Sequence, residues 1–298
     1  VMLDQADCGP ATISMAQDVQ GEAYDYPEIF FEEKIHEIRR IQPDPNQIKA
    51  AAEKLKLSKQ PIIIAGGGIL YSEAEKELSD FAKKHNIPVT PTVMGLGCMD
   101  RDDPYYIGAI GALGVGSSNS LSKNTDLALA VGTKLGDFTT GSWANFENED
   151  FKLVSINTTR FDVTKHRATP VISDAKIGFE ELSKALGDWR APNIWFERAV
   201  KERTKWDSYV DKESGPTNRE LPTYAHAVGA IYRNADPSDI VVTAAGGLVG
   251  EVVQVWKPKQ INTFETEWGF SCMGYEISGA LGIKMAKPDQ DVIVFIGD

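Results

Sequence analysis

The residue of this chain whose type and position best suit a metal ion is an aspartate that follows a glycine and an apolar run. Asp298 comes after Gly297 and the run VIVFI, which ends at Ile296. This run lacks polar alternation, which predicts a parallel strand covered on both faces. Ligands lie at the carboxyl ends of such strands, and Mg²⁺ prefers oxygen ligands. The pattern favours a metal-binding Asp298, and the alternative is an aspartate that turns the chain or caps a helix.

Two glycines end a second apolar run, DIVVTAAGG, at Gly246 and Gly247. Glycines at the carboxyl end of a strand can present backbone N–H groups to phosphate oxygens, because no side chain stands in the way. The sequence therefore predicts two adjacent strand ends, one with a phosphate-binding turn and one with a metal ligand, and a loop around Met273 between them.

The segment after that loop, at about 274–286, has the spacing of a helix. One stripe is apolar: Met273, Ile277, Leu281 and Met285. A second stripe carries almost no side-chain bulk: Gly274, Ser278, Gly282 and Ala286. A helix that is apolar on one face and small on the other is predicted to be buried rather than to lie on the surface.

Upstream of these segments, helical and apolar stretches alternate, which predicts a doubly wound parallel sheet. Helices are expected at 46–58, 73–84, 177–186 and 223–235, with a capping box formed by Ser72 and Glu75. Strands are expected at 61–65, 87–93, 126–131, 151–157 and 169–174.

Three glycine-rich turns test whether this middle region binds a dinucleotide. Turns that start at Gly66, Gly95 and Gly114 all lack the third glycine of the fingerprint. Tight strand-to-helix turns explain these glycines without a ligand, so a structural role is favoured. A nucleotide-binding regulatory module at 45–187 remains the alternative from a different class.

The motifs FSCMG at 270–274, GALG at 279–282 and VFIGD at 294–298 resemble the diphosphate-binding domain of thiamine-diphosphate enzymes. The resemblance implies an α/β fold, with a doubly wound parallel-sheet central domain plus a partial thiamine-diphosphate-binding α/β domain. It also implies thiamine diphosphate and Mg²⁺ as cofactors. The family's metal motif begins with GDG and ends with an asparagine further along, and this chain stops at the aspartate.

The resemblance assigns roles to particular residues. Met273 falls where the family places a bulky apolar residue beneath the bent cofactor, and the backbone near Ser271 and Met273 would bind the pyrimidine edge. The diphosphate would contact Gly246, Gly247 and Leu248, and the metal would contact Asp298. The activating glutamate is expected in a pyrimidine-binding domain outside these residues, and the cofactor site is expected to span two subunits.

A closer resemblance, along essentially the whole chain, is to the acylhydrolases of myo-inositol breakdown that open trihydroxycyclohexane-1,2-dione. It rests on segments that include IIIAGGGILYS and GFSCMGYEISGALGIKMA. It implies hydrolytic ring opening to 5-deoxy-glucuronate. Val249 stands where proline is expected, and Trp268 where tyrosine is expected. Glu267 is a candidate for substrate contact, and a solvated Glu267 beside a core-packed Trp268 is the alternative. Another thiamine-diphosphate enzyme, either an acetolactate-synthase-like carboligase or a 2-keto acid decarboxylase, is the nearest rival.

Composition limits the partners. The 298 residues include 31 basic and 43 acidic side chains, for a net charge of −12, which argues against a nucleic-acid or anionic-membrane surface. The three cysteines are widely spaced and predict thiols in a reducing compartment. The four histidines are predicted to lie on the surface or in linkers. With no signal peptide visible, we expect a cytoplasmic location. The resemblance implies a homodimer or homotetramer that acts on a small polyol-derived diketone.

The predicted organisation has five parts. Residues 1–20 read as the tail of a preceding pyrimidine-binding-type domain that ends in a strand at 11–19. A linker at 21–44, helical in its middle, is closed by Pro43-Asp44-Pro45. The central Rossmann-like domain is expected at 45–187, a helical linker at 188–221, and the truncated first part of the diphosphate-binding domain at 222–298. We therefore expect the chain to be a piece of a longer polypeptide.

Overall fold

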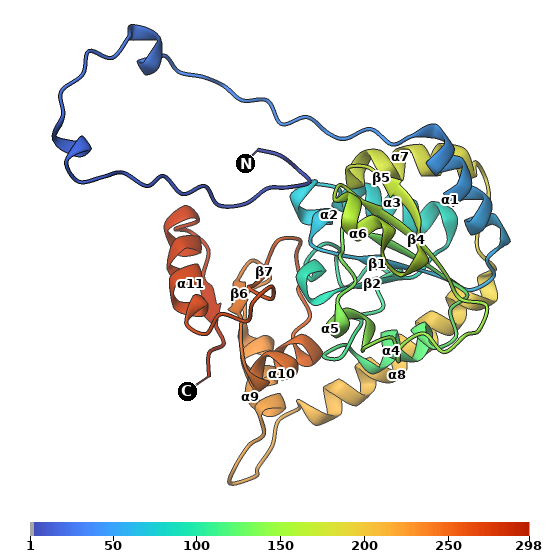
Figure 1. The fold of residues 1–298 in the computed structure, drawn as a ribbon. Coiled ribbons are helices and arrows are strands. Elements are labelled where there is room, and N and C mark those ends of the chain that lie inside the picture. The colour runs from blue at the N-terminus through green and yellow to red at the C-terminus, as the bar shows by residue number, and fades with distance from the viewer. Residues whose placement is uncertain (1–2, 298) are drawn as a thin grey trace.

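The computed structural model describes residues 3–297 and contains two parallel sheets flanked by helices (Figure 1). The larger sheet has the strand order β2-β1-β3-β4-β5, with bounds β1 (Pro61–Ala65), β2 (Val89–Pro91), β3 (Leu127–Val131), β4 (Lys152–Asn157) and β5 (Thr169–Ile172). The smaller sheet has the order β7-β6-β8, with bounds β6 (Ile240–Thr243), β7 (Phe264–Thr266) and β8 (Val292–Val294). The predicted α/β fold is therefore confirmed.

Helices connect the strands in sequence. The α-helices are α1 (Pro45–Leu57), α2 (Gly68–Tyr71), α3 (Glu75–His85), α4 (Gly116–Ser122), α5 (Asp137–Thr140), α6 (Arg160–Thr164), α7 (Ala175–Leu186), α8 (Asn193–Glu213), α9 (Tyr224–Asn234), α10 (Gly247–Val255) and α11 (Tyr275–Ala286). Short 3₁₀ turns are η1 (Val19–Gly21), η2 (Glu28–Phe31), η3 (Val93–Gly95) and η4 (Lys165–Arg167). Within residues 3–297, no helix is long and apolar enough to cross a bilayer.

The larger sheet is covered on both faces, because successive side chains of a strand point to opposite sides. Ile63 and its neighbours on one face pack with Leu55, Phe81 and Phe179 of α1, α3 and α7. On the other face Ile62 lies in a cluster with Leu121 of α4 and Trp195 of α8. Strand β1 is buried at every position. This two-sided burial explains why the strands are continuous apolar runs rather than alternating ones.

Helix α8 also connects the two sheets through the Asp207 carboxylate, which lies among three cations. The Lys257 ammonium is 2.5 Å away, the Arg203 guanidinium 3.5 Å and the Arg101 guanidinium 4.0 Å. Arg101 also donates a 2.7 Å hydrogen bond to the Tyr232 hydroxyl of α9. Because Arg101 belongs to the larger-sheet region and Lys257 to the smaller-sheet region, this cluster joins the two parts of the molecule.

The glycine-rich turn after β1 is explained by close backbone packing. A Cβ built on Gly66 would lie 2.2 Å from the Gly132 carbonyl oxygen, and one built on Gly68 would lie 2.6 Å from the Gly132 Cα. The strand order reverses between β1 and β3, which is where ligands bind in such sheets. Here the two turns are in direct contact, in agreement with the predicted structural role of these glycines.

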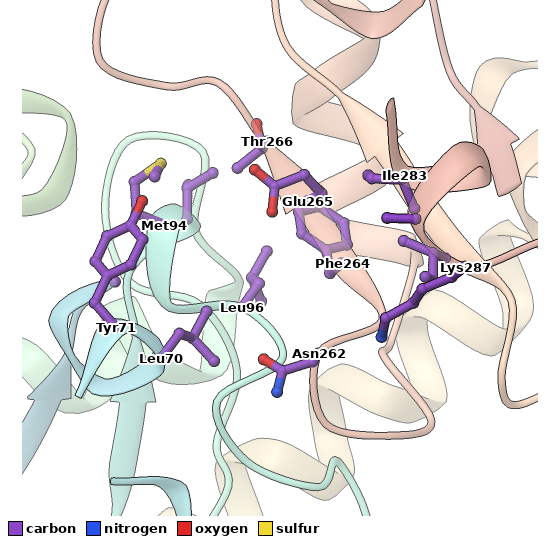
Figure 2. Close-up of a pocket in the computed structure, with 14 residues that line it drawn as sticks. Leu70, Tyr71, Met94, Leu96, Asn262, Phe264, Glu265, Thr266, Ile283 and Lys287 are labelled. Carbon is purple, nitrogen blue, oxygen red and sulfur yellow. The ribbon is translucent and has the colours of Figure 1, made fainter. Parts of the chain in front are cut away.

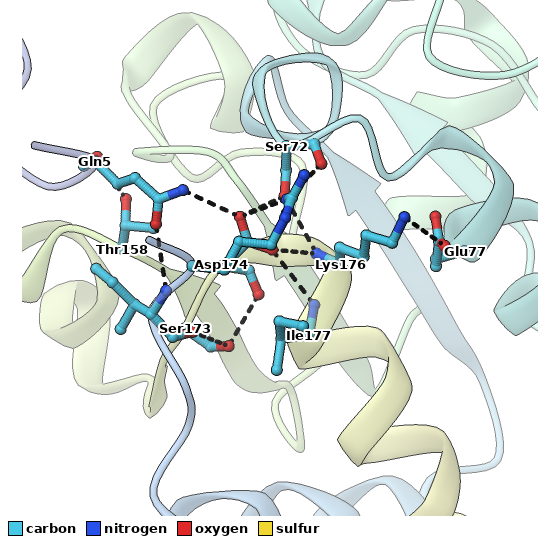
Figure 3. Close-up of polar contacts among 10 residues, drawn as sticks. Gln5, Ser72, Glu77, Thr158, Ser173, Asp174, Lys176 and Ile177 are labelled. Atoms are coloured by element: carbon cyan, nitrogen blue, oxygen red, sulfur yellow. Dashed lines mark hydrogen bonds and ion pairs between the residues drawn. The ribbon is translucent and has the colours of Figure 1, made fainter. Parts of the chain in front are cut away.

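The N-terminal segment makes a long excursion from the body and is held at both ends (Figure 1). Asp174, which is 2% exposed, accepts hydrogen bonds from Arg40 at 3.0 Å and from Ser72 at 2.6 Å, and Gln5 lies 3.5 Å away (Figure 3). Between these ends, the predicted strand at 11–19 is wrong, and the predicted linker helix is reduced to η2. A strand needs backbone partners, and no described residue pairs with 11–19.

Two further predictions are corrected. Helix α3 begins at Glu75 without a side-chain cap, because the Ser72 hydroxyl donates to Asp174 instead of capping the helix. His85 lies in the core rather than on the surface. Its Nδ1 is 2.7 Å from the Trp189 carbonyl oxygen and its Nε2 is 3.0 Å from the Ser183 hydroxyl. Burial lowers the pKa of His85, and the nearby Lys84 and Arg190 add to the shift.

This burial predicts a pH-dependent stability. Because the folded pKa of His85 lies below the ordinary value of 6.5, its contribution is complete above about pH 6.5 and is lost as the pH falls through the folded pKa. We expect urea unfolding to show a lower free energy at pH 5.5 than at pH 7.5. His85→Gln should remove most of this difference. His36→Gln, on the exposed N-terminal segment, should retain it; equal pH dependence in wild type and His85→Gln would contradict the assignment.

Candidate cofactor-binding site

The N-terminus of α10 has the features of a diphosphate cradle. Gly246 has φ +89° and ψ −176°, a conformation essentially restricted to glycine, and no side chain caps the helix. A Cβ on Gly246 or Gly247 would meet no atom within 4 Å. The first N–H groups of a helix lack internal partners and bind anions. Both glycines are exposed and Leu248 is half-buried, so the turn and its amides fit a diphosphate.

The Met273 loop is held in shape by the Glu267 carboxylate. Glu267 accepts a 2.8 Å hydrogen bond from the Phe270 N–H and a 2.6 Å hydrogen bond from the Cys272 N–H. These bonds lower the pKa of Glu267, the one from Cys272 most strongly. Ser271, which lies between Phe270 and Cys272, has a φ of +51°. Met273, which follows Cys272, is 90% exposed. The loop therefore presents an apolar side chain outward on a backbone that Glu267 holds.

A second carboxylate joins this loop to the α10 turn. Glu276, in the first turn of α11, is 2% exposed. Its Oε1 accepts a 3.1 Å hydrogen bond from the Ala245 N–H, and its Oε2 accepts a 3.0 Å hydrogen bond from the Gly274 N–H. One buried side chain thus links the turn at Gly246, which the resemblance assigns to the diphosphate, to the loop at Met273, which it assigns to the space beneath the bent cofactor.

The predicted adjacency of the two strand ends is confirmed. Strand β8 pairs with β6 in parallel, with Val294 opposite Val242, and the Phe295 N–H continues the ladder to the Val242 carbonyl at 2.9 Å. Gly297 and the Gly246 turn therefore follow neighbouring strands. Asp298 lies outside the described residues. Within 3–297, no three His, Cys, Asp or Glu side chains gather as a metal site.

The predicted burial of the 274–286 helix is wrong for the chain by itself. In α11 only Glu276 and Ala280 are buried, and exposures reach 65% at Ile277 and 75% at Met285. The small-residue stripe is exposed as well. Strand β8 is only partly covered, not buried on both faces. The helix has one side on β6 and β8, and no described element covers its other side.

The two residues before the loop have different surroundings. The Trp268 ring packs edge-on against Phe138 of α5, with centroids 5.3 Å apart, and belongs to the core of the smaller sheet. Trp268 therefore packs against the core, as the second of the two predicted alternatives expected. Both oxygens of Glu267 are engaged with backbone amides, so its present contacts are structural. Val249 is 1% exposed and lies within α10.

Comparison with known families assigns the class. Residues 48–182 match the thiamine pyrophosphate enzyme central domain, and residues 244–298 match the C-terminal TPP-binding domain of the same enzymes. The first match covers the larger sheet, and the second begins at the strand end that carries Gly246. The chain therefore belongs to the thiamine pyrophosphate enzymes, whose cofactors are thiamine diphosphate and Mg²⁺.

Two individual relatives of the chain carry the same printed name. The chain is 37% identical over 322 residues to the 3D-(3,5/4)-trihydroxycyclohexane-1,2-dione hydrolase of Clostridium tetani, and 36% identical over 320 residues to the hydrolase of the same name from Geobacillus thermodenitrificans. Each match covers 100% of this chain and 50% of the relative. The chain thus spans about half the length of the curated relatives it matches.

Sequence reasoning did not single out Glu276. The available signal was a carboxylate in the first turn of a helix whose other positions are mostly small or apolar. A charged residue in such a setting needs hydrogen-bond partners when it is buried. Its partners are two backbone amides from separate loops, and these cannot be paired from spacing alone.

We predict that Glu276→Gln loosens the Met273 loop, because an amide can accept only one of the two hydrogen bonds. The loss of a charge-assisted bond costs about 1.5–3 kcal/mol, so hydrogen exchange at the Ala245 and Gly274 amides should accelerate roughly tenfold or more. Glu251→Gln on α10, where no hydrogen bond involves the side chain among the described residues, is the matched control. Unchanged exchange in Glu276→Gln would show that the bridge does not hold the loop.

Proposed function

We propose that this chain forms the central domain and part of the cofactor domain of a longer enzyme that hydrolyses trihydroxycyclohexane-1,2-dione to 5-deoxy-glucuronate in myo-inositol breakdown. The observation that carries the proposal is the match of the whole chain to hydrolases of that printed name. The open glycine turn of α10 supports it, because this turn fits the diphosphate of the cofactor that the reaction needs.

The chain's own residues would bind and orient the cofactor. The amides of Gly246, Gly247 and Leu248 would donate to the diphosphate, and the backbone around Ser271 and Met273 would contact the pyrimidine. Asp298 would contribute one oxygen to Mg²⁺. When bound, thiamine diphosphate supplies a nucleophilic carbon and an electron sink for breaking a C–C bond beside a carbonyl. Glu276 would keep the two binding loops at a constant separation, and Glu267 would hold the shape of the Met273 loop.

The proposed assembly is a homodimer or homotetramer. The uncovered face of α11 supports it, because Ile277, Leu281 and Met285 form an apolar surface beside the cofactor loop, and such surfaces mark contacts with another chain or domain. The activating glutamate would come from a pyrimidine-binding domain, in the same site but outside these residues. The proposed location is the cytoplasm.

The complete polypeptide should consume the cyclic 1,2-diketone and release an open-chain acid, and should show little turnover of pyruvate. Turnover should require thiamine diphosphate and Mg²⁺, and calorimetric titration should show cofactor binding that Mg²⁺ strengthens. Asp298→Ala should remove the strengthening by Mg²⁺ while the fold is retained. Preferred conversion of pyruvate, to acetolactate or to acetaldehyde, would instead support the carboligase or decarboxylase alternative.

A substitution at the glycine turn separates cofactor binding from folding. Gly247→Val adds a side chain where no atom lies within 4 Å, so the melting temperature should change little. The same side chain would occupy the space assigned to the diphosphate and should weaken thiamine diphosphate binding at least tenfold in calorimetry. Gly246→Ala is the contrasting variant: its φ of +89° should cost about 1–3 kcal/mol of stability. Unaltered cofactor affinity in Gly247→Val would remove this turn from the site.

A further inference from the structure

The excursion of the N-terminal segment at 10–39 is exposed at every residue (Figure 1). Many of its side chains are nevertheless large and apolar, with exposures that range from 52% at Val19 to 84% at Ile13 and Ile35. Free linkers are rich in Gly, Ser, Pro and charged residues and poor in aromatic and β-branched ones. This segment therefore has the composition of a surface that another part of a protein covers, rather than that of a free linker.

Four rings of the excursion pack on one another, and we call them the aromatic cluster: Tyr24, Tyr26, Phe30 and Phe31. Three pairs of their ring centroids lie 4.9, 5.2 and 5.3 Å apart. Turn η2 brings them together, because the Phe30 N–H donates a 2.9 Å hydrogen bond to the Pro27 carbonyl oxygen. The rings stay 54–72% exposed despite this packing. The cluster is thus preformed but uncovered.

The aromatic cluster is surrounded by negative charge. Five acidic residues lie among and beside its rings: Glu22, Asp25, Glu28, Glu32 and Glu33. No basic residue occurs between 22 and 33, and no ion pair among the described residues involves these carboxylates. A surface that matches the cluster therefore has an apolar centre and a rim of Lys or Arg.

Both ends of the excursion are fixed to the larger-sheet region at one residue, Asp174. Its carboxylate contacts Gln5 and Arg40, and its N–H donates a 3.0 Å hydrogen bond to the Ile41 carbonyl oxygen (Figure 3). These anchors confine the aromatic cluster to a limited volume beside that region. Confinement raises the effective concentration of the cluster for a covalently linked domain, so a partner within the same polypeptide is favoured over a free one.

Two apolar sites of the described chain suit the aromatic cluster poorly. The cavity between α2 and β7 has a volume of about 260 Å³ (Figure 2), which is below the usual range of about 300–1,000 Å³ for ligand pockets and small for four rings. Its lining includes the carboxylate of Glu265, which would repel the acidic residues of the excursion. The other site, the uncovered face of α11, lies beside the cofactor loop and is assigned to a contact with another chain. A larger candidate is the half of the relatives' length that has no counterpart in this chain.

We propose that the aromatic cluster is a docking element that packs on the half of the longer polypeptide absent from this structure, against an apolar surface with a basic rim. The excursion then fixes the position of that half relative to the larger sheet, instead of joining the two loosely. This inference rests on one part of the proposed function, the longer polypeptide, and not on the reaction.

Hydrogen exchange in the complete polypeptide tests the docking. The amides of 24–31 should exchange at least tenfold more slowly than those of an unstructured peptide. Phe30→Ser removes an apolar contact of the cluster and should abolish this protection, while the amides of β1 in the core stay protected. Phe161→Ser on α6 is the matched control, since this ring is similarly exposed, at 73%, but lies outside the cluster. It should leave the protection of 24–31 unchanged.

Amine-specific cross-linking at Lys34, which is exposed and follows the acidic residues, identifies the covering surface. We expect cross-links from Lys34 to lysines that lie outside these 298 residues. Unprotected amides at 24–31, or cross-links from Lys34 only to lysines within the 298 residues, would overturn the proposal; the second result would indicate a second copy of the chain. A polypeptide that opens the ring but leaves 24–31 unprotected would overturn the docking alone, so the two failures are distinguishable.

Discussion

The candidate cofactor site depends on one buried carboxylate. Glu276 is a charged group in an environment that excludes water, and burial of this kind is tolerated only when hydrogen bonds compensate it. Its two oxygens are satisfied by backbone amides from two different loops. The loops therefore cannot separate without leaving a buried charge unpaired, and this penalty is larger than the modest net value of the two hydrogen bonds. The spacing between the α10 turn and the Met273 loop follows from this constraint.

The larger sheet supports the candidate site by packing rather than by direct contact with a cofactor. At its β1–β3 switch point, the usual ligand position in such folds, the turns at Gly66–Gly68 and Gly132 pack in direct backbone contact. This contact gives the glycine-rich turn a packing role, and the nucleotide-module alternative is not favoured. The chemistry is left to the smaller sheet, and the larger sheet and α8 hold that sheet in place.

Much of the architecture could be predicted from periodicity and glycine placement. The strand IIIA, the helix after Gly274 and the turn at Gly246 have local signals, because period, apolar continuity and glycine at a strand end are properties of short segments. Burial of α11 could not be predicted correctly, since burial depends on what lies opposite a helix as well as on its own faces. His85 and Glu276 were missed for a related reason: their partners, Ser183 and Ala245, are distant in sequence and meet them only in three dimensions.

The Asp207 cluster makes part of the connection between the two sheets sensitive to salt, which the apolar cores of the sheets are not. Three cations from separate segments share one carboxylate whose side chain is 28% exposed, so dissolved ions reach the cluster and screen it. The sheets are held by buried apolar contacts, which screening leaves intact. The junction also contains buried apolar contacts, because Val93 and Leu96 of the larger-sheet region pack in one cluster with Phe264 of the smaller sheet. Salt therefore weakens the ionic part of the junction and leaves its apolar part in place.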